Sequence, residues 1–177
     1  MNTAKVRKLV FAAFFAAVIF LGTFVIKIPI PNGYIHFGDG FIYVAAALLP
    51  IPYAMAAAAV GGLLADLIAG FAAYAPFTAV VKLLIALVVG LIARNNAFVG
   101  RLRGHSTQTG GFVPLIAASI AGGAVNVGGY FATDCILYGL AAAVSSCPMN
   151  CLQSAFGIVV FFLFLPILTK AFVKFDR

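Results

Sequence analysis

Four ionisable side chains interrupt or border long apolar runs, and they are the residues of this sequence best placed to do chemistry. Between Asp39 and Lys82 the chain carries no charge other than Asp66, and Asp134 stands in a second uncharged region. An ionisable side chain in such a setting is costly to bury and usually faces a cavity or a partner. Their positions therefore predict a polar pocket between apolar helices.

Helical spacing places further polar residues beside these charges. Residues three, four and seven apart share one face of a helix. Three sets follow this rule: Thr78 with Lys82; Asn126, Tyr130 and Asp134; and Asn150, Gln153, Ser154 and Gly157. We expect each set to turn toward a common pocket.

The polar stretch from Pro29 to Tyr43 is expected at the mouth of that pocket. Pro29 and Pro31 end the preceding helix, because proline lacks an amide donor and restricts the residue before it. Asn32-Gly33 is a turn signal. Asp39 is placed to cap a helix that begins near Gly40 or Phe41. The stretch is either a lid over a small molecule or an ordinary connecting loop with a helix cap.

The residue types of the predicted pocket suit a small, flat, polar heteroaromatic ligand. Aromatic rings can stack on the faces of such a molecule, while amides and charges bind its edge. The candidate substrate-binding residues are Tyr34, His36, Asp39, Tyr43, Asp66, Tyr74, Thr78, Lys82, Asn126, Tyr130, Asp134, Asn150 and Gln153. No catalytic residue and no metal site is predicted.

Composition identifies the elements that must position these groups as membrane helices. The 177 residues are 64% hydrophobic and 8% charged, and the mean hydropathy is +1.16, whereas soluble domains carry about 25% charged residues. A spanning helix needs about 20 apolar residues, so the chain has room for about six. We predict an all-α fold: one domain over residues 1–177, built as an integral membrane bundle of six transmembrane helices.

The second expected span is much shorter than the others. Pro50 ends it, and at about 1.5 Å per residue it cannot cross a membrane alone. Either the stretch before it dips into the bundle or the bilayer is thin at this place. Irregular backbone at that depth is tolerated only if it is buried in protein or lines a cavity. The expected spans are Val6–Ile26, Gly40–Leu49, Tyr53–Ala69, Phe77–Ala93, Phe112–Leu140 and Cys147–Phe172.

The basic residues orient this bundle. With six spans, both termini and the hydrophilic loop over residues 94–111 share one side, and the positive-inside rule makes that side cytoplasmic. The other side carries Lys27 alone and should face outward with the polar stretch, the Tyr74 link and the link from Tyr138 to Ser146. The cytoplasmic set is Lys5, Arg7, Lys8, Arg94, Arg101, Arg103, Lys170, Lys174 and Arg177.

Structural roles compete with ligand binding for several of these residues. Asp66 and Lys82 could form a buried ion pair, or Lys82 could extend its amine toward the membrane surface. Asn150 and Gln153 could cap or bridge helices. We expect His36 to be a hydrogen-bonded loop residue rather than a metal ligand, because the second histidine belongs to the cytoplasmic loop.

Several function classes are not supported by the sequence. The net charge of +7 follows from the membrane orientation and is no sign of nucleic-acid binding. A phosphate-binding Gly-x-x-x-x-Gly-Lys-Ser/Thr loop is missing, so the chain cannot drive ATP-powered transport by itself and no cofactor is expected. The cysteines form no disulfide framework and are expected to fill helix contacts; they are Cys135, Cys147 and Cys151.

With these residues in view, the chain resembles the substrate-binding S components of energy-coupling factor (ECF) vitamin transporters. The resemblance covers nearly the whole chain and is closest to the subgroup assigned to pyridoxine or the hydroxymethylpyrimidine precursor of thiamine, near the riboflavin type. Its specific parts are Ala12-Ala13-Phe14-Phe15-Ala16-Ala17, Gly33 to Asp39, Ala65-Asp66-Leu67, Tyr74-Ala75-Pro76-Phe77-Thr78 to Lys82, and Asn150 with Gln153.

The resemblance implies a role in vitamin uptake at a bacterial plasma membrane. An S component captures a vitamin from outside and passes it inward with a transmembrane T subunit and two cytoplasmic ATPases, which use the ATP. The two overlapping Ala-x-x-x-Ala pairs, Ala12 with Ala16 and Ala13 with Ala17, would dock on the T subunit. Small residues let helices approach closely in lipid, and the sequence does not choose between the pairs.

Different substrates and different functions compete with this one. Riboflavin or another vitamin could replace the small ring as substrate. Phe37-Gly38-Asp39 with Asp66 is partly similar to an intramembrane aspartyl protease, in which two carboxylates share a proton, although that motif needs glycine where this chain has His36. The apolar helices could also form a channel, a self-sufficient carrier or a structural scaffold, but a scaffold leaves the clustered polar groups unexplained.

Overall fold

The structure is a computed structural model that describes residues 3–30, 33–93, 96, 99 and 111–176; the side chains of residues 27–30, 33–34 and 172–176 lie outside the description. Six helices and one hairpin make up the described part, so the predicted all-α bundle is confirmed. In chain order the elements are α1 (Thr3–Phe24), β1 (Lys27–Ile30), β2 (Gly33–His36), α2 (Gly38–Leu48), α3 (Ile51–Ile68), α4 (Ala75–Ala93), α6 (Val113–Tyr138) and α7 (Leu140–Asp176).

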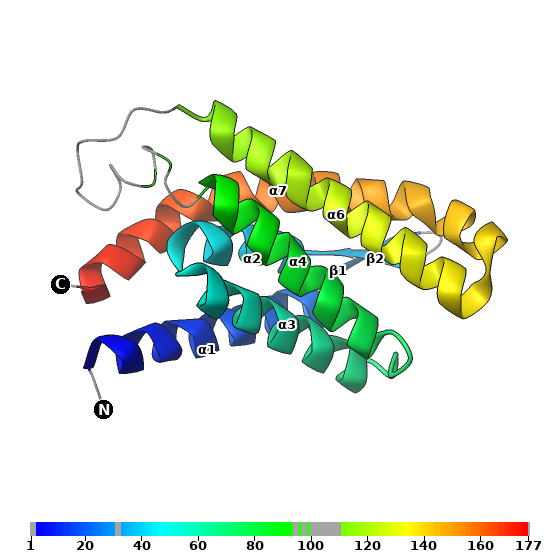
Figure 1. Cartoon of the computed structure of the whole chain (residues 1–177), viewed down its shortest axis with the longest axis horizontal. Helices are drawn as coiled ribbons and strands as arrows, with labels where there is room; N and C mark the ends of the chain where they lie inside the picture. The colour runs from blue at the N-terminus through cyan, green and yellow to red at the C-terminus, as the bar shows by residue number, and fades with distance from the viewer. Residues whose placement is uncertain (1–2, 31–32, 94–95, 97–98, 100–110, 177) are drawn as a thin grey trace.

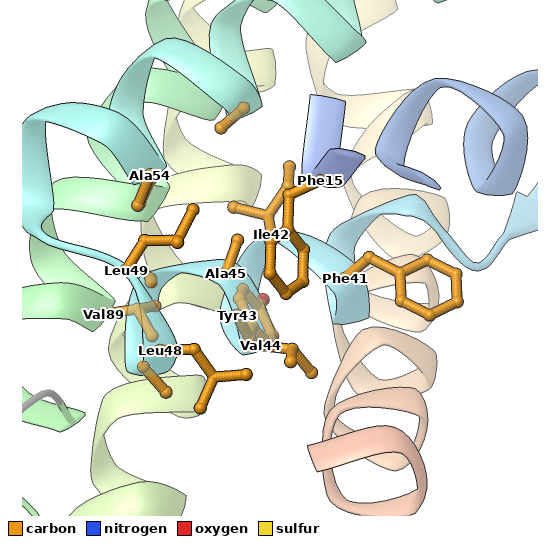
Figure 2. Packing of buried hydrophobic residues seen from close by; sticks show 14 of the residues in the cluster. Phe15, Phe41, Ile42, Tyr43, Val44, Ala45, Leu48, Leu49, Ala54 and Val89 are labelled. Carbon is orange, nitrogen blue, oxygen red and sulfur yellow. The ribbon is translucent and has the colours of Figure 1, made fainter. Parts of the chain in front are cut away.

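The short helix α2 forms the centre of the bundle. All of its residues are buried, and it packs against α1, α3, α4 and α7. Its side chains share one hydrophobic cluster with Phe15 of α1 and Val89 of α4 (Figure 2). Apart from α2, the five other described helices are long and apolar enough to cross a membrane. The predicted second span is therefore a buried helix in the middle of the bundle, and six full spans are not established.

The stretch expected to be a lid begins with a β-hairpin. Strands β1 and β2 pair antiparallel, with Lys27 opposite His36 and Pro29 opposite Tyr34. Both strands are edges, where proline is tolerated. Ile35 is buried, and β2 contacts α7, so the stretch enters the bundle, as the first of the two alternatives predicts. The Asn32 end of the expected turn lies outside the described residues.

The expected cap at the start of α2 is wrong. Phe37 occupies the N-cap position without a side-chain hydrogen bond, and Asp39 lies inside the first turn. There a carboxylate still interacts favourably with the positive end of the helix dipole. The side chain of Asp39 is directed instead to partners on α4 and α7.

Helices α6 and α7 form an antiparallel hairpin whose turn is much tighter than the sequence predicts. Only Gly139 separates them, with φ +88°, a conformation that favours glycine. The expected link from Tyr138 to Ser146 is thus largely the first two turns of α7, and the predicted start at Cys147 is wrong. Pro148 lies inside α7, where a membrane-type bundle tolerates it because neighbouring groups can satisfy the freed carbonyl.

Both described ends of the chain lie at one end of the molecule, and the α3–α4 link and the α6–α7 turn lie at the other (Figure 1). The hairpin also extends toward the end with the α6–α7 turn. The arrangement agrees with the predicted topology, but the side of the membrane on which the termini lie stays a prediction. Most of the predicted loop over residues 94–111 lies outside the described residues.

Candidate ligand-binding site

A cavity of about 630 Å³ opens at the end of the bundle that carries the α3–α4 link and the α6–α7 turn. Thirteen of its fifteen lining residues carry a polar group. Pockets of roughly 300–1,000 Å³ enclose ligands of vitamin size. The lining residues are Thr23, His36, Asp66, Phe71, Tyr74, Thr78, Lys82, Asn126, Tyr130, Asp134, Ser145, Ser146, Met149, Asn150 and Gln153.

Lys82, which is held in a buried ion pair, forms the floor of this cavity. The Lys82 Nζ atom lies 2.6 Å from Asp39 Oδ1 and donates a second hydrogen bond of 3.0 Å to Asn126 Oδ1. It also lies 4.9 Å from the centre of the Tyr130 ring, within the range of a cation–π interaction. The structure thus pairs Lys82 with Asp39, a partner that was not among the alternatives weighed from the sequence.

The geometry of α3 and α4 explains why Lys82 turns inward. Its side chain is 3% exposed, so it does not extend to the surface. Gly62 of α3 faces it: a Cβ atom there would lie 3.0 Å from Lys82 Cγ and 3.1 Å from Thr78 Cγ2. The missing side chain lets α3 approach α4 closely while the lysine stem lies between them. In such a place an ammonium group is tolerated only with a partner.

Gln153 of α7 connects the hairpin to the ion pair. Its Oε1 accepts a 3.0 Å hydrogen bond from the His36 backbone amide. Its Nε2 donates to the His36 carbonyl at 3.0 Å and to Asp39 Oδ2 at 3.2 Å. The His36 ring accepts from the Gly38 amide. Gln153 therefore bridges helices, the structural role that competes with ligand binding, and His36 is hydrogen-bonded at the end of β2.

Asp134 of α6 joins three elements at the cavity rim. The Tyr74 hydroxyl in the α3–α4 link donates to Asp134 Oδ1 at 2.6 Å, and Ser146 of α7 donates a short hydrogen bond to Oδ2. Burial, and then the hydrogen bond to Asp134, raise the pKa of Tyr74 above its ordinary value, so Tyr74 remains a protonated donor. Both carboxylate oxygens are thus engaged by neutral hydroxyl groups.

Amides and hydroxyls complete the wall. Asn126 Nδ2 donates to Ser154 Oγ at 3.1 Å, and the Ser154 hydroxyl donates to the Asn150 carbonyl at 2.8 Å. Thr78 and Tyr130 share a hydrogen bond of 3.1 Å between their hydroxyls. The wall groups are therefore held in fixed orientations, which is the preorganisation that ligand binding needs.

Ten of the thirteen predicted site residues line the cavity, two do not, and the side chain of one lies outside the description. Asp39 lies beneath the floor in the ion pair. Tyr43 is a core residue whose ring packs edge-on against Phe161 at 5.9 Å, because Asp39 and Tyr43 lie on a helix that is buried on every side. The side chain of Tyr34 lies outside the described residues. The ten are His36, Asp66, Tyr74, Thr78, Lys82, Asn126, Tyr130, Asp134, Asn150 and Gln153.

Five lining residues are absent from the predicted set. Ser145 and Ser146 fall within the expected link, and their place on α7 follows only once the helix is known to begin at Leu140. Nothing in the local sequence marks Thr23 or Met149 as a pocket residue. Phe71 lies in the short link before Tyr74. Among the described residues, no three histidine, cysteine or acidic side chains are grouped as a metal site would need.

Helices long enough to cross a membrane, gathered around a polar cavity at one end, define a membrane-embedded binding protein for a small molecule. The particular family follows from comparison with known proteins. Residues 3–170 match the family of the S component of ECF-type riboflavin transporters. The chain belongs to this family.

Two further similarities were found. A Pyrococcus woesei protein described as an uncharacterized protein in a gap 3' region is 31% identical over 140 residues, which cover 78% of this chain and 85% of that protein. The crystal structure of an S component for biotin from an ECF-type ABC transporter superposes with a TM-score of 0.68 at 20% identity, over 98% of this chain and 94% of the other. At this identity the second similarity shows the fold alone.

Membership of this family decides among the classes weighed from the sequence. S components bind a vitamin and work with the T and ATPase subunits of an ECF module. They are not enzymes, so an aspartyl protease is not favoured. The chain is a multi-pass membrane protein of vitamin transport.

Proposed function

We propose that the 630 Å³ cavity captures a small heteroaromatic vitamin or vitamin precursor, of the pyridoxine or hydroxymethylpyrimidine type, for import by an ECF module. One observation carries this proposal: thirteen of the fifteen lining residues, from the hairpin and from α1, α3, α4, α6, α7 and the α3–α4 link, bring a polar group to one cavity. Polar and ionisable groups are rare within membrane helices, and where they gather they usually mark the path or the binding site of a solute.

The lining offers a substituted ring what it needs for recognition. Tyr74, Tyr130 and Phe71 provide aromatic surfaces for stacking. Lys82 uses two of its three N–H donors on Asp39 and Asn126, which leaves one for a ring nitrogen or hydroxyl. The cavity wall also includes the amide residue Asn150. A small ring with several hydroxymethyl or amino substituents would satisfy these donors and acceptors.

Riboflavin is the second candidate, because the family match is to riboflavin S components. Its large fused ring needs broad apolar surfaces on both faces. Only Phe71 and Met149 among the lining residues are wholly apolar, which favours the smaller and more polar ligand.

For docking on a T subunit, we propose the pair Ala13 and Ala17. Both are exposed on α1, whereas Ala12 is buried and Ala16 half-buried. The backbone of Ala16 faces Gly61 of α3, where an added Cβ would lie 2.8 Å from the Ala16 carbonyl. The pair Ala12 and Ala16 thus serves contact within the bundle, and Ala13 and Ala17 remain open to a partner helix.

The proposal is tested by measuring binding to the purified full chain. Pyridoxine, hydroxymethylpyrimidine and riboflavin are each titrated by calorimetry in mild detergent, and ligand carried through purification is identified by native mass spectrometry. We expect one small heteroaromatic compound to bind at a single site. Asn150→Ala should weaken that binding by about 1–3 kcal/mol, because a buried ligand group loses its partner.

A matched control lies on the same helix. Leu152 is 47% exposed on the outer side of α7, so Leu152→Ala should leave the affinity unchanged. Tighter binding of riboflavin than of the small rings would select the second candidate. The absence of binding by all three compounds to folded protein would contradict the proposed ligand class.

A further inference from the structure

The positive charge in the cavity is already compensated. Lys82 is the one lysine or arginine among the cavity-lining residues of the described chain. Its Nζ atom is held 2.6 Å from Asp39 Oδ1, and the Asp39 side chain is fully buried. The Nζ atom donates a second hydrogen bond to Asn126, and the centre of the Tyr130 ring lies 4.9 Å away. An anionic ligand would therefore find a hydrogen-bond donor here but no uncompensated cation.

Negative charge remains at the rim. Asp134 lines the cavity, and the hydroxyls of Tyr74 and Ser146 donate to its two carboxylate oxygens. Hydroxyl donors stabilise a carboxylate without cancelling its charge. With the ion pair of the floor neutral overall, Asp134 gives this part of the cavity a negative field, and membrane surroundings of low polarity screen that field weakly.

From these contacts we infer that the cavity selects uncharged or positively charged forms of its ligand and rejects anions, both phosphate esters and carboxylates. The inference rests on the proposed function and names the charge class of its ligand. A phosphate ester would bring up to two negative charges toward Asp134 and would have to separate Lys82 from Asp39 to gain a counter-ion. The parent alcohol meets neither obstacle.

The experiment compares each vitamin with its own phosphate ester. Pyridoxine, hydroxymethylpyrimidine and riboflavin are each paired with their own monophosphate ester, and biotin serves as a carboxylate probe. Dissociation constants are measured by calorimetry on the full-length protein in detergent at low salt. For whichever parent compound binds, we expect the ester to bind at least about tenfold more weakly. We also expect no measurable binding of biotin.

Three variants test whether Asp134 causes this selectivity against anions. Asp134→Asn removes the charge, so the dissociation constant of the ester should come closer to that of its parent vitamin. Ser146→Ala removes one donor to the same carboxylate but keeps its charge, so this control should preserve the ratio of the two dissociation constants. Asn150→Asp adds a carboxylate to the wall and should increase the ratio of the ester's dissociation constant to that of the parent vitamin. The ratio remains informative even if a variant lowers both affinities.

The outcomes separate this inference from the proposed function. If a parent vitamin binds and its ester binds within about threefold, or if biotin binds comparably, charge selection is wrong while vitamin binding stands. An ester ratio unchanged in Asp134→Asn would overturn the role of Asp134. If neither parent nor ester binds to folded protein, the proposed ligand class fails and the inference fails with it.

Discussion

Lys82 and Asp39 show at the scale of single residues why the cavity has a polar floor. Two buried charges are costly to remove from water, and their attraction offsets that cost only with good geometry and further hydrogen bonds. Asn126 and Gln153 supply those bonds to the lysine and the aspartate. The pair therefore stabilises the floor as a unit rather than through either residue alone.

Breaking this pair from one side should be severe. Lys82→Met leaves the Asp39 carboxylate buried without its counter-ion, and we expect a loss of about 3–5 kcal/mol in the free energy of unfolding. The double variant Asp39→Asn with Lys82→Met removes both charges and should recover most of that stability. Denaturant or thermal unfolding in detergent measures both values.

Ligand affinity distinguishes the two roles of Lys82. The double variant should remain unable to bind ligand tightly, since it lacks the third donor of Lys82. Equal instability of the single and double variants would show that packing, and not charge pairing, governs this site.

At the scale of elements, prediction from sequence succeeds where a pattern is local. Long apolar runs predict the helices, and Pro50 predicts the end of the short helix α2. Spacing by four places Thr78 with Lys82, and Asn126 with Tyr130, on faces that line the cavity. These features follow from helical spacing, which can be recognised within a short stretch of sequence.

Prediction fails where a partner lies far away in sequence. Asp39 meets Lys82 across 43 positions, and Gln153 meets His36 across 117. No spacing rule reports such contacts, so local patterns suggest a cap role for Asp39 and do not identify it as the partner of Lys82. The start of α7 is hidden because Pro148 resembles a helix start, although this helix continues through it.

The turn at Gly139 offers a test at this scale. Its φ of +88° is unfavourable for residues with a Cβ atom, so Gly139→Ala should lower the free energy of unfolding by about 1–3 kcal/mol. Ser145 and Ser146 follow the turn, and we expect weaker ligand binding as well.

The control for this substitution is Gly128→Ala on α6. A Cβ atom there meets nothing within 4 Å, and helical alanine is favoured over glycine, so Gly128→Ala should be neutral or slightly stabilising. Unfolding in detergent measures both variants. If the two substitutions have the same effect, the backbone conformation at Gly139 does not determine how α6 meets α7.

At the scale of the whole molecule, the ligand-binding cavity and the proposed docking face of α1 are separate surfaces. The cavity is lined by residues of the α3–α4 link and the start of α7, at the end opposite the termini (Figure 1), while Ala13 and Ala17 of α1 are exposed. Exposed small residues allow close approach of another membrane helix. Ligand capture and partner docking should therefore be separable by mutation.

Ala13→Leu combined with Ala17→Leu should leave ligand affinity unchanged and abolish uptake by the assembled transporter. The added side chains block close helix approach but do not reach the cavity. Ala117 is an exposed alanine on α6, and Ala117→Leu is the control that should retain uptake. Uptake is measured in vesicles that contain the complete transporter. Loss of binding in the α1 double variant would instead place this face within the binding site.

The central claim is that a vitamin occupies the polar cavity above Lys82. An experimental structure of the ligand-loaded protein tests it most directly. We expect density for one small ring within hydrogen-bond distance of Lys82 Nζ, and we expect Tyr130 and Asn150 to contact the same ligand molecule. Ligand density at any other place, in a protein that binds its vitamin in equal molar ratio, would contradict the account.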